Sequence, residues 1–220
     1  MPVVAYILTA VVAYLLGSIP TGYLVAKARG IDIRMAGSGN IGATNAMRVL
    51  GKPMGIFVLL MDALKGFVAC ALLAAIFFAK RYSVPDRLIN GDELEHAKIL
   101  AGIFVILGHN FTCWLKFKGG KGIATTGGVY LALAPWAVLI GVTAFILAVL
   151  ATRYVSIGSI VAAVALPVAV WILPPHNLLM GIVTTALGVM AIYKHRGNIQ
   201  RLMAGTESRL GKKATTEVPR

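Results

Sequence analysis

Glycine and lysine occur together in residues 108–125, the segment of this sequence best suited to chemistry. It lies between two long apolar runs and contains Gly119-Gly120-Lys121-Gly122. Glycine frees the backbone φ angle and exposes N–H groups, so such a backbone can approach an anion closely. Lys121, enclosed by glycines, fits anion binding better than a topology-setting charge, whereas topology explains Lys116 and Lys118 at least as well. We therefore predict a phosphate site at a membrane surface.

A second glycine-rich segment, residues 37–48, contains the pattern Gly-x-Gly-x-x-Gly. It follows an apolar run and a cationic loop instead of a strand in a βαβ unit, so we reject a dinucleotide-binding loop. Its glycines stand beside Ser38, Thr44, Asn45 and Arg48. Hydroxyl, amide and guanidinium donors of this kind can surround a phosphate together with backbone N–H groups.

A third segment begins after the last apolar run, over residues 194–207, and is rich in basic residues. A basic run next to a membrane span is usually a topology signal or a lipid anchor. Asn198 and Glu207 serve neither purpose, so their presence favours a functional site.

Several other chemistries find little support in the sequence. His96 and His176 fall in expected external connections, while His109 and His195 belong to separate internal loops without clustered acidic or thiol partners, so we expect no metal site. Gly122 stands where a Walker A loop needs Ser or Thr, which argues against nucleotide hydrolysis. No Gly-x-Ser-x-Gly elbow supports a nucleophilic serine, and we expect no cofactor.

The composition indicates the elements that position these segments. The chain has 220 residues, of which 58% are apolar and 13% charged, with a mean hydropathy of +0.82. Because lipid requires every backbone polar group to be bonded internally, this composition predicts an all-α polytopic membrane protein. We expect one domain over residues 1–220, with 212–220 as a flexible tail. The net charge of +13 fits the positive-inside rule and attraction to anionic lipids better than nucleic-acid binding.

Charge distribution predicts the topology. Basic residues follow the first apolar run, so the N-terminus is expected outside and the C-terminus in the cytoplasm, while the nearly neutral connection 80–98 is expected outside. The glycine- and lysine-rich segment within residues 108–125, called the Gly/Lys loop, and the basic tail over residues 194–220 belong on one side. This requires an even number of crossings between them. We therefore split the run 123–152 at Ala134-Pro135-Trp136, giving about seven transmembrane helices. This split also brings Ser156 to the cytoplasmic face.

The first and second expected spans each contain residues that are unusual inside a membrane. Pro20 lacks a backbone donor and is expected to kink the first span. Asp62 and Lys65 stand at i, i+3 spacing within the second span, where charges are costly. This spacing lets them pair on one helix face, and we expect a structural ion pair in preference to a direct chemical role.

Taken together, the three segments resemble the signatures of the bacterial acyl-phosphate:glycerol-3-phosphate acyltransferase family, which consists of integral membrane enzymes. The matching stretches are residues 37–45 with Arg48, residues 108–125, and residues 194–202 with Gly205-Thr206-Glu207. The hydropathy layout matches over nearly the whole chain. The resemblance implies seven spans with an external N-terminus, in the bacterial inner membrane, with the active site at the cytoplasmic face.

The resemblance also implies a reaction in phospholipid synthesis. A fatty acyl group passes from acyl phosphate to the sn-1 hydroxyl of glycerol 3-phosphate, which gives 1-acyl-glycerol 3-phosphate (lysophosphatidate) and phosphate. Both substrates are phosphate-bearing anions, and the acyl tail can stay among the helices. The expected partners are these substrates and membrane lipids, with no nucleic acid and no obligate protein partner.

On this hypothesis Arg48, Lys121 and His195 bind the phosphates, and Ser38 and Asn198 orient the acceptor. The general base stays open between His109, His195, Glu207 and a phosphate oxygen of the donor. The expected catalytic residues are Ser38, Arg48, Lys121, His195, Asn198 and Glu207. The expected substrate-binding residues are Gly37, Asn40, Thr44, Asn45, His109, Gly119, Gly120, Gly122, Thr125, Ser156, Arg196 and Arg201.

The alternative is a membrane transporter of a phosphorylated small molecule. Such a protein is expected to place ionisable groups near mid-membrane on several helices. Here only Asp62 and Lys65 are expected to lie deep, and the other candidate residues are expected on one face. This distribution favours the enzyme.

Overall fold

A computed structural model describes residues 2–73, 91–174 and 177–211. Within these ranges every regular element is a helix and no strand forms, so the all-α prediction is confirmed. Most of the expected external connection 80–98, His176 and the expected tail 212–220 lie outside the described residues. The elements are α1 (Pro2–Ser18), α2 (Thr21–Lys27), η1 (Ile33–Met35), α3 (Ala43–Leu50), α4 (Lys52–Val68), η2 (Ala69–Leu73), α6 (Gly91–Asn110), η4 (Cys113–Leu115), α7 (Ile123–Leu133), α8 (Pro135–Thr152), α9 (Val155–Ile172), α10 (Leu178–Lys194) and α11 (Arg196–Met203).

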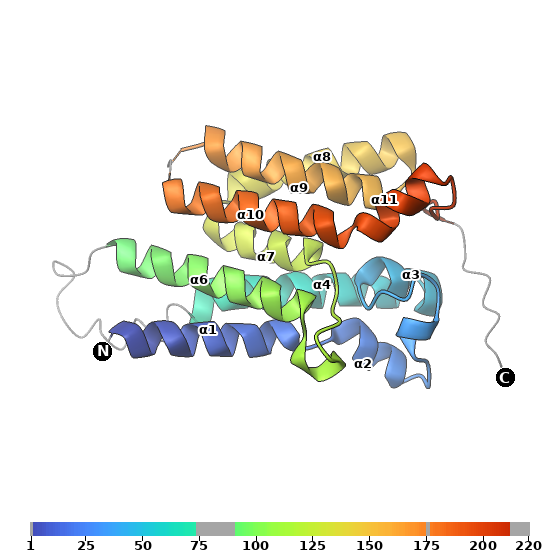
Figure 1. The fold of residues 1–220 in the computed structure, drawn as a ribbon, viewed down its shortest axis with the longest axis horizontal. Coiled ribbons are helices and arrows are strands. Elements are labelled where there is room, and N and C mark those ends of the chain that lie inside the picture. The colour runs from blue at the N-terminus through green and yellow to red at the C-terminus, as the bar shows by residue number, and fades with distance from the viewer. Residues whose placement is uncertain (1, 74–90, 175–176, 212–220) are drawn as a thin grey trace.

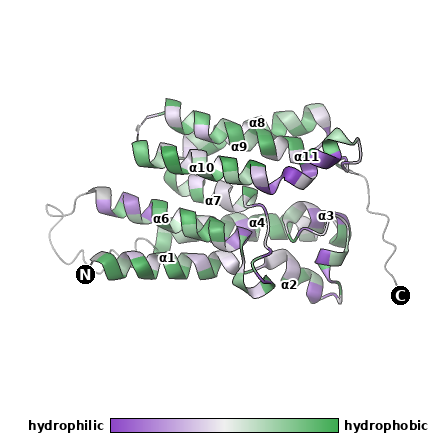
Figure 2. Cartoon of the chain, viewed as in Figure 1, coloured by the Kyte–Doolittle hydropathy of each residue, from purple (hydrophilic) through white to green (hydrophobic). Residues whose placement is uncertain are grey.

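The long helices run roughly along one axis (Figure 1). Helix α1 packs along α6, α4 along α7, and α8 along α9, with α10 against α9. The short helices α2, α3 and α11 gather at the end of the bundle opposite the N-terminus. Figure 2 shows that the long helices are mainly hydrophobic, whereas α11 and the loops near it carry hydrophilic residues. Polar chemistry is therefore concentrated toward one end.

The described residues include five helices long and apolar enough to cross a membrane, and six if the bent pair α10–α11 forms one span. Helix α7 is apolar but shorter, with 11 residues. Large apolar side chains such as Leu147, Leu150 and Trp136 are exposed on the outside of the bundle, as lipid contact requires. The chain is a polytopic integral membrane protein, while the count of seven spans, the orientation and the single domain stay predictions.

The predicted break at Ala134-Pro135-Trp136 is confirmed, because α7 ends at Leu133 and α8 begins at Pro135. Proline suits the first position of a helix, where its missing N–H would have no intrahelical partner. At 1.5 Å per residue α7 is only about 16 Å long, roughly half the thickness of the hydrocarbon core. Figure 1 accordingly shows α7 starting well inside the bundle, short of the end where α8 finishes.

The predicted kink at Pro20 is also confirmed, since α1 ends at Ser18 and α2 begins at Thr21. A hydrogen bond from α4 reaches the backbone at this break. Lys65 Nζ donates to the Ile19 carbonyl at 3.1 Å, and Lys65 pairs with Asp62 at 2.8 Å. The expected ion pair therefore forms, and it also satisfies a backbone group that the helix break leaves free.

Glycines allow α4 and α7 to touch through their backbones. A Cβ on Gly128 would lie 1.8 Å from the Ala63 carbonyl oxygen, and a Cβ on Gly66 would lie 2.2 Å from the Thr125 carbonyl oxygen. Small residues permit this close approach of helices in membranes. In contrast, a Cβ on the neighbouring Gly127 would meet no atom within 4 Å.

This contrast predicts the effect of two alanine substitutions on adjacent positions. Gly128→Ala forces α4 and α7 apart and should lower the stability by about 1–3 kcal/mol, the usual cost of overpacking. Gly127→Ala is the matched control and should leave stability unchanged or slightly raised, because alanine favours a helix. Thermal unfolding of both purified variants in detergent measures the difference. Equal melting temperatures would contradict the packing described for Gly128.

Candidate active site

A polar pocket of about 130 Å³ lies where the three segments from the sequence analysis meet. Residues of α3, α4, α6, α7, α8, α9 and α11 surround it, together with the loop before α3, the Gly/Lys loop and the stretch after α11. Its lining residues are Ser38, Asn40, Gly42, Ala43, Thr44, Asn45, Arg48, Leu59, Asp62, His109, Lys121, Gly122, Ile123, Ala124, Phe145, Val155, Ser156, Ser159, His195, Asn198 and Glu207.

Asn45 shapes the first segment. Its buried amide donates to the carbonyls of Ala36 and Asn40, at 3.0 and 2.8 Å, and its oxygen accepts the Ser38 N–H at 2.8 Å. Gly37 has a φ of 60°, and a Cβ there would lie 2.3 Å from the Asn45 oxygen. The hydrogen bonds of Asn45 therefore fix the conformation of this loop. Gly37 leaves room for the Asn45 side chain and does not line the pocket.

Arg48 follows this loop on α3 and reaches toward the stretch after α11. Its Nη2 donates to the Ser208 carbonyl at 3.1 Å. Burial lowers the pKa of Arg48, and the neighbouring Glu207 raises it. An arginine stays protonated through such shifts, so Arg48 supplies a permanent positive charge at one wall of the polar pocket.

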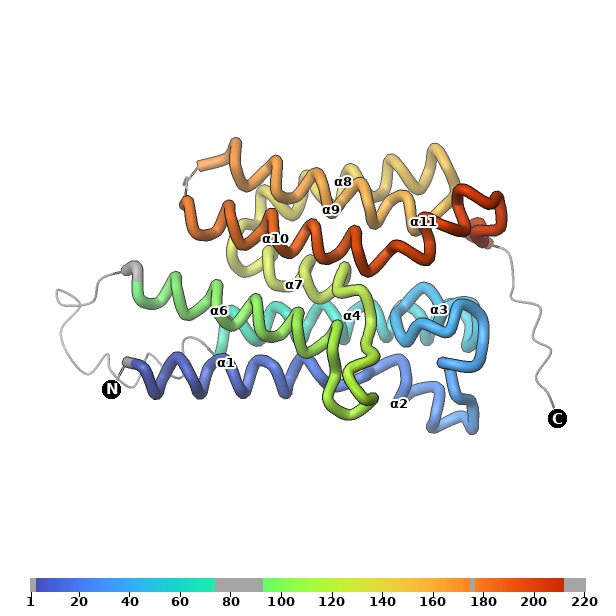
Figure 3. Tube along the Cα trace, viewed as in Figure 1, coloured from blue at the N-terminus to red at the C-terminus, as the bar shows by residue number. Residues whose placement is uncertain are grey.

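The Gly/Lys loop folds back on the end of α6 (Figure 3). The N–H groups of Gly119 and Gly120 donate to the carbonyls of Asn110 and His109, at 3.2 and 2.9 Å. A Cβ on Gly120 would lie 2.1 Å from His109 Nε2. These two glycines were expected to offer N–H groups to an anion, but they serve close packing instead and do not line the polar pocket.

Gly122 is the glycine of this loop that does line the pocket. Its φ is 83°, and α7 begins directly after it without a side-chain cap. Ile123 and Ala124, in the first turn of α7, also line the pocket. The first N–H groups of a helix have no intrahelical partner and favour a negative charge. The N-terminus of α7 therefore offers the anion-binding backbone that the sequence suggested for the whole loop.

Lys121 starts a chain of hydrogen bonds across the polar pocket. Its Nζ donates to Asn198 Oδ1, Asn198 Nδ2 donates to Glu207 Oε1 at 2.8 Å, and Arg201 Nε donates to Glu207 Oε2 at 2.7 Å. Burial, reinforced by the charge of Arg201, lowers the pKa of Lys121 to about 8. Residues from two distant segments are thus joined at the centre of the site.

Glu207 remains a carboxylate in this chain. Burial alone would raise its pKa, but the hydrogen bonds from Asn198 and Arg201 outweigh burial and hold the pKa below its usual value. Ser156 lies beside it and contributes in the same direction. Glu207 is therefore an anchored anion that positions Asn198.

His195 stands at the bend between α10 and α11. Its Nδ1 lies 2.8 Å from the Ala191 carbonyl oxygen, so in the neutral ring Nδ1 carries the proton and Nε2 is free to accept one. The side chain is 3% exposed and lines the polar pocket. It can donate to a phosphate when protonated or accept a proton when neutral.

Asp62 also lines the polar pocket, although its sequence position favoured a structural ion pair over a direct chemical role. It pairs with Lys65 and lies 3.6 Å from His109 Nδ1, while Thr21 Oγ1 donates to it at 3.4 Å. The signal in the sequence was the rarity of a carboxylate inside an apolar helix. Ser159 of α9 also lines the pocket, and no motif pointed to it.

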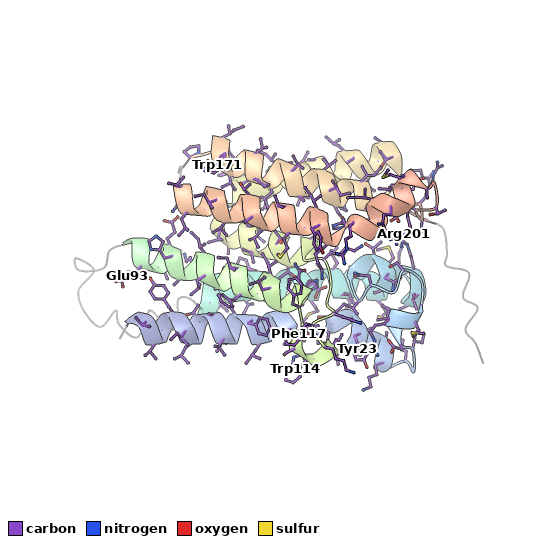
Figure 4. The ribbon with its side chains drawn as sticks, in the orientation of Figure 1. Tyr23, Glu93, Trp114, Phe117, Trp171 and Arg201 are labelled. Carbon is purple, nitrogen blue, oxygen red and sulfur yellow. The ribbon has the colours of Figure 1, made fainter. Side chains whose placement is uncertain are left out.

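All six expected catalytic residues line the polar pocket, whereas six of the expected substrate-binding residues do not. Thr125 faces α4, and its buried hydroxyl has no hydrogen-bond partner among the described residues. Arg196 is exposed and lies over the Tyr193 ring, 4.5 Å from its centre. Arg201, labelled on α11 in Figure 4, acts through Glu207. The residues that do not line it are Gly37, Gly119, Gly120, Thr125, Arg196 and Arg201.

An apolar groove of about 370 Å³ adjoins the polar pocket. Leu59, Ile123, Ala124 and Phe145 line both spaces. From this shared rim the groove extends between α7, α8, α9 and α10, with α4 at one side. A ligand with a polar head and a long apolar tail fits this combination.

The charge balance of the polar pocket favours an anionic head. Arg48 and Lys121 are cationic, and Asp62 and Glu207 are already bonded to basic or amide groups. The α7 N-terminus adds partial positive charge. Among the described residues, no group of three or more His, Cys, Asp or Glu side chains is placed to hold a metal ion. The arrangement is suited to binding phosphate groups through protein donors.

Comparisons with known proteins agree with this geometry. Residues 7–205 match the family described as glycerol-3-phosphate acyltransferase. A glycerol-3-phosphate acyltransferase of Geobacter sulfurreducens is 47% identical over 92% of this chain and 96% of the relative. That of Geobacter metallireducens is 50% identical over 90% and 93%, and that of Agrobacterium fabrum is 43% identical over 94% and 92%.

Two crystal structures of PlsY, an integral membrane glycerol 3-phosphate acyltransferase, have the same fold. The glycerol 3-phosphate form is 36% identical, with a TM-score of 0.80 over 94% of this chain and 96% of that chain. The lysophosphatidic acid form is 35% identical, with a TM-score of 0.77 over 94% and 95%. The chain therefore belongs to the glycerol-3-phosphate acyltransferase family.

Proposed function

We propose that this acyltransferase moves a fatty acyl group from acyl phosphate to the sn-1 hydroxyl of glycerol 3-phosphate. The products are 1-acyl-glycerol 3-phosphate (lysophosphatidate) and inorganic phosphate, for phospholipid synthesis. One observation carries the proposal: a cationic polar pocket adjoins an apolar groove and shares four lining residues with it. Acyl phosphate has an anionic head and a long apolar chain, so both halves of the donor find matching surroundings.

The choice of donor also rests on the sequence. The His-x4-Asp element of acyltransferases that use CoA or carrier-protein donors is absent after each of the four histidines. An acyl phosphate is a mixed anhydride and already carries a good leaving group. The protein then has to bind, orient and stabilise charge, and positioning with electrostatics can supply most of the rate.

Arg48, Lys121 and the α7 N-terminus are assigned to the phosphates, with His195 beside them. The two cations come from separate segments and lie on walls of one pocket. Ser38 and Asn198 are assigned to orient the acceptor hydroxyl. Because Asn198 is held by Glu207 at 2.8 Å, its amide is fixed before substrate arrives. Such pre-organisation reduces the cost of aligning the reacting groups.

The proton of the acceptor hydroxyl needs a destination. Both oxygens of Glu207 accept hydrogen bonds, and His109 has Nδ1 toward Asp62 and Nε2 packed on Gly120. Two acceptors remain, namely His195 Nε2 and an oxygen of the donor phosphate. In either case the hydroxyl oxygen bonds to the acyl carbon, the bond from that carbon to the phosphate oxygen breaks, and phosphate leaves.

We also propose that the protein lies in the bacterial inner membrane with the polar pocket at the cytoplasmic face. The support is the position of the basic residues. Lys27, Arg29 and Arg34 occur at the end of α2 and between α2 and α3, and Arg153 follows α8. Figure 1 shows that α2, α3 and the basic helix α11 gather at one end of the bundle. Positive loops stay preferentially in the cytoplasm. Glycerol 3-phosphate and released phosphate would exchange with that compartment.

The donor assignment predicts the outcome of a direct assay. Purified protein with acyl phosphate and glycerol 3-phosphate should release phosphate and form lysophosphatidate in equal amounts. Acyl-CoA or an acylated carrier protein of the same chain length should give no product above the enzyme-free background. Turnover with either thioester at a comparable rate would overturn the proposed donor and leave the family assignment intact.

The phosphate assignment predicts a steep loss on removal of either cation. Arg48→Ala and Lys121→Ala should each lower kcat/KM by about a hundredfold or more, as removal of one oriented charge-stabilising group does. Lys118→Ala is the matched control in the same loop, because Lys118 is exposed and does not line the pocket. It should keep nearly full activity. Near wild-type rates in both pocket variants would exclude this site.

Lys121 predicts a pH dependence. Its pKa is lowered to about 8, so its charge is present below that pH and is lost as the pH rises through it. The kcat/KM for glycerol 3-phosphate, which reports the free enzyme, should therefore decline above pH 8. Arginine stays charged, so Lys121→Arg should keep a flat profile to higher pH, whatever its absolute rate. An identical alkaline decline in both proteins would show that another group titrates.

A further inference from the structure

Three glycines line the apolar groove, and they differ in what surrounds them. A Cβ on Gly188 would lie 2.6 Å from the Ala163 carbonyl oxygen, so this glycine is required for α9–α10 packing. A Cβ on Gly141 would meet the Leu166 Cβ at 3.6 Å, an ordinary contact, and one on Gly127 would meet nothing within 4 Å. Packing accounts for Gly188 but not for Gly127 or Gly141.

The two unexplained glycines lie at matching depths. Gly127 follows the rim residue Ile123 by four positions on α7, and Gly141 precedes the rim residue Phe145 by four positions on α8. Because four residues make about one helical turn, or roughly 6 Å, each glycine lies one turn beyond the junction with the polar pocket. They are therefore placed at the same level on two walls of the groove.

The groove continues past this level. Tyr130 and Leu131 on α7, Val138 on α8 and Leu166 on α9 line it further from the polar pocket. The hydroxyls of Tyr130 and Thr184 share a hydrogen bond there, so neither presents a free polar group to the groove. An apolar chain that starts at the polar pocket and lies along the α7 and α8 walls passes Gly127 and Gly141 before it reaches this region.

We propose that Gly127 and Gly141 determine acyl-chain selection by leaving open a gap through which long acyl chains pass. Helical glycine is unfavourable compared with alanine, and here neither glycine is needed for a close backbone contact. The absence of side chains gives the groove its width one turn beyond the rim. The inference rests on the proposed function, since it takes the occupant of the groove to be the donor's acyl chain, which is continuous with the phosphate head in the polar pocket.

The test compares Gly127→Leu with wild type on two donors, palmitoyl phosphate and hexanoyl phosphate. The Cβ of the added side chain would meet no atom within 4 Å, and its remaining carbons extend into the groove that Gly127 lines. The kcat/KM for palmitoyl phosphate should fall at least about tenfold, since loss of apolar contacts is discriminated on this scale, and that for hexanoyl phosphate should change less than about threefold. The KM for glycerol 3-phosphate should stay unchanged. Gly141→Leu should shift selection in the same direction.

Thr143→Leu is the control, because Thr143 is exposed on α8 and does not line the groove. It should leave the ratio of the two donors unchanged. Equal losses on both donors in Gly127→Leu, or no loss on either, would overturn the inference. Wild type that turns over neither acyl phosphate would instead overturn the proposed donor, so the two failures are distinguishable.

Discussion

The ion pair of Asp62 and Lys65 places two charges inside a bundle with an apolar outer surface, where each charge must be bonded. Its contacts extend beyond the pair. Lys65 donates to the Ile19 carbonyl at the α1–α2 break, while Asp62 accepts from Thr21 and faces His109 at the end of α6. Three elements are thus fixed around one carboxylate, and that carboxylate also lines the polar pocket. The buried Asp62 carboxylate therefore links the packing of these helices to the polar pocket.

From His109 the same set of contacts extends to the Gly/Lys loop. The His109 carbonyl accepts the Gly120 N–H at 2.9 Å, and its ring fills the space that a Cβ of Gly120 would need. Lys121 follows directly, and α7 begins inside the bundle because it is only 11 residues long. A full-length helix would carry Lys121 to the end of the bundle, away from the groove. The short helix is therefore what allows the polar pocket and the apolar groove to share a rim.

Much of this could be predicted from the sequence where the signal is local. Proline chemistry located the break at Pro20, and i, i+3 spacing identified the ion pair of Asp62, whereas the break at Pro135 was located by charge parity. The meeting of three distant segments followed from their positive charge and from a family resemblance, not from any one motif. Which polar groups stay free was not predictable, because it depends on partners far along the chain. The amide of Asn45 is used within its own loop, and the N–H of Gly119 is used by the end of α6.

The roles of the glycines also depend on partners far along the chain and could not be predicted from the sequence. In the sequence they suggested backbone that approaches an anion, yet the structure gives them different surroundings. Gly120 makes room for the His109 ring and Gly128 makes room for the α4 backbone, whereas Gly127 borders open space. The adjacent glycines on α7 therefore have different roles. Gly128 allows α7 to contact the α4 backbone, whereas Gly127 leaves open space beside α7. Glycines at close contacts support the polar half of the site, and glycines beside open space line the apolar half. On our proposal, substitutions in the first class affect folding and those in the second affect selection of the acyl chain.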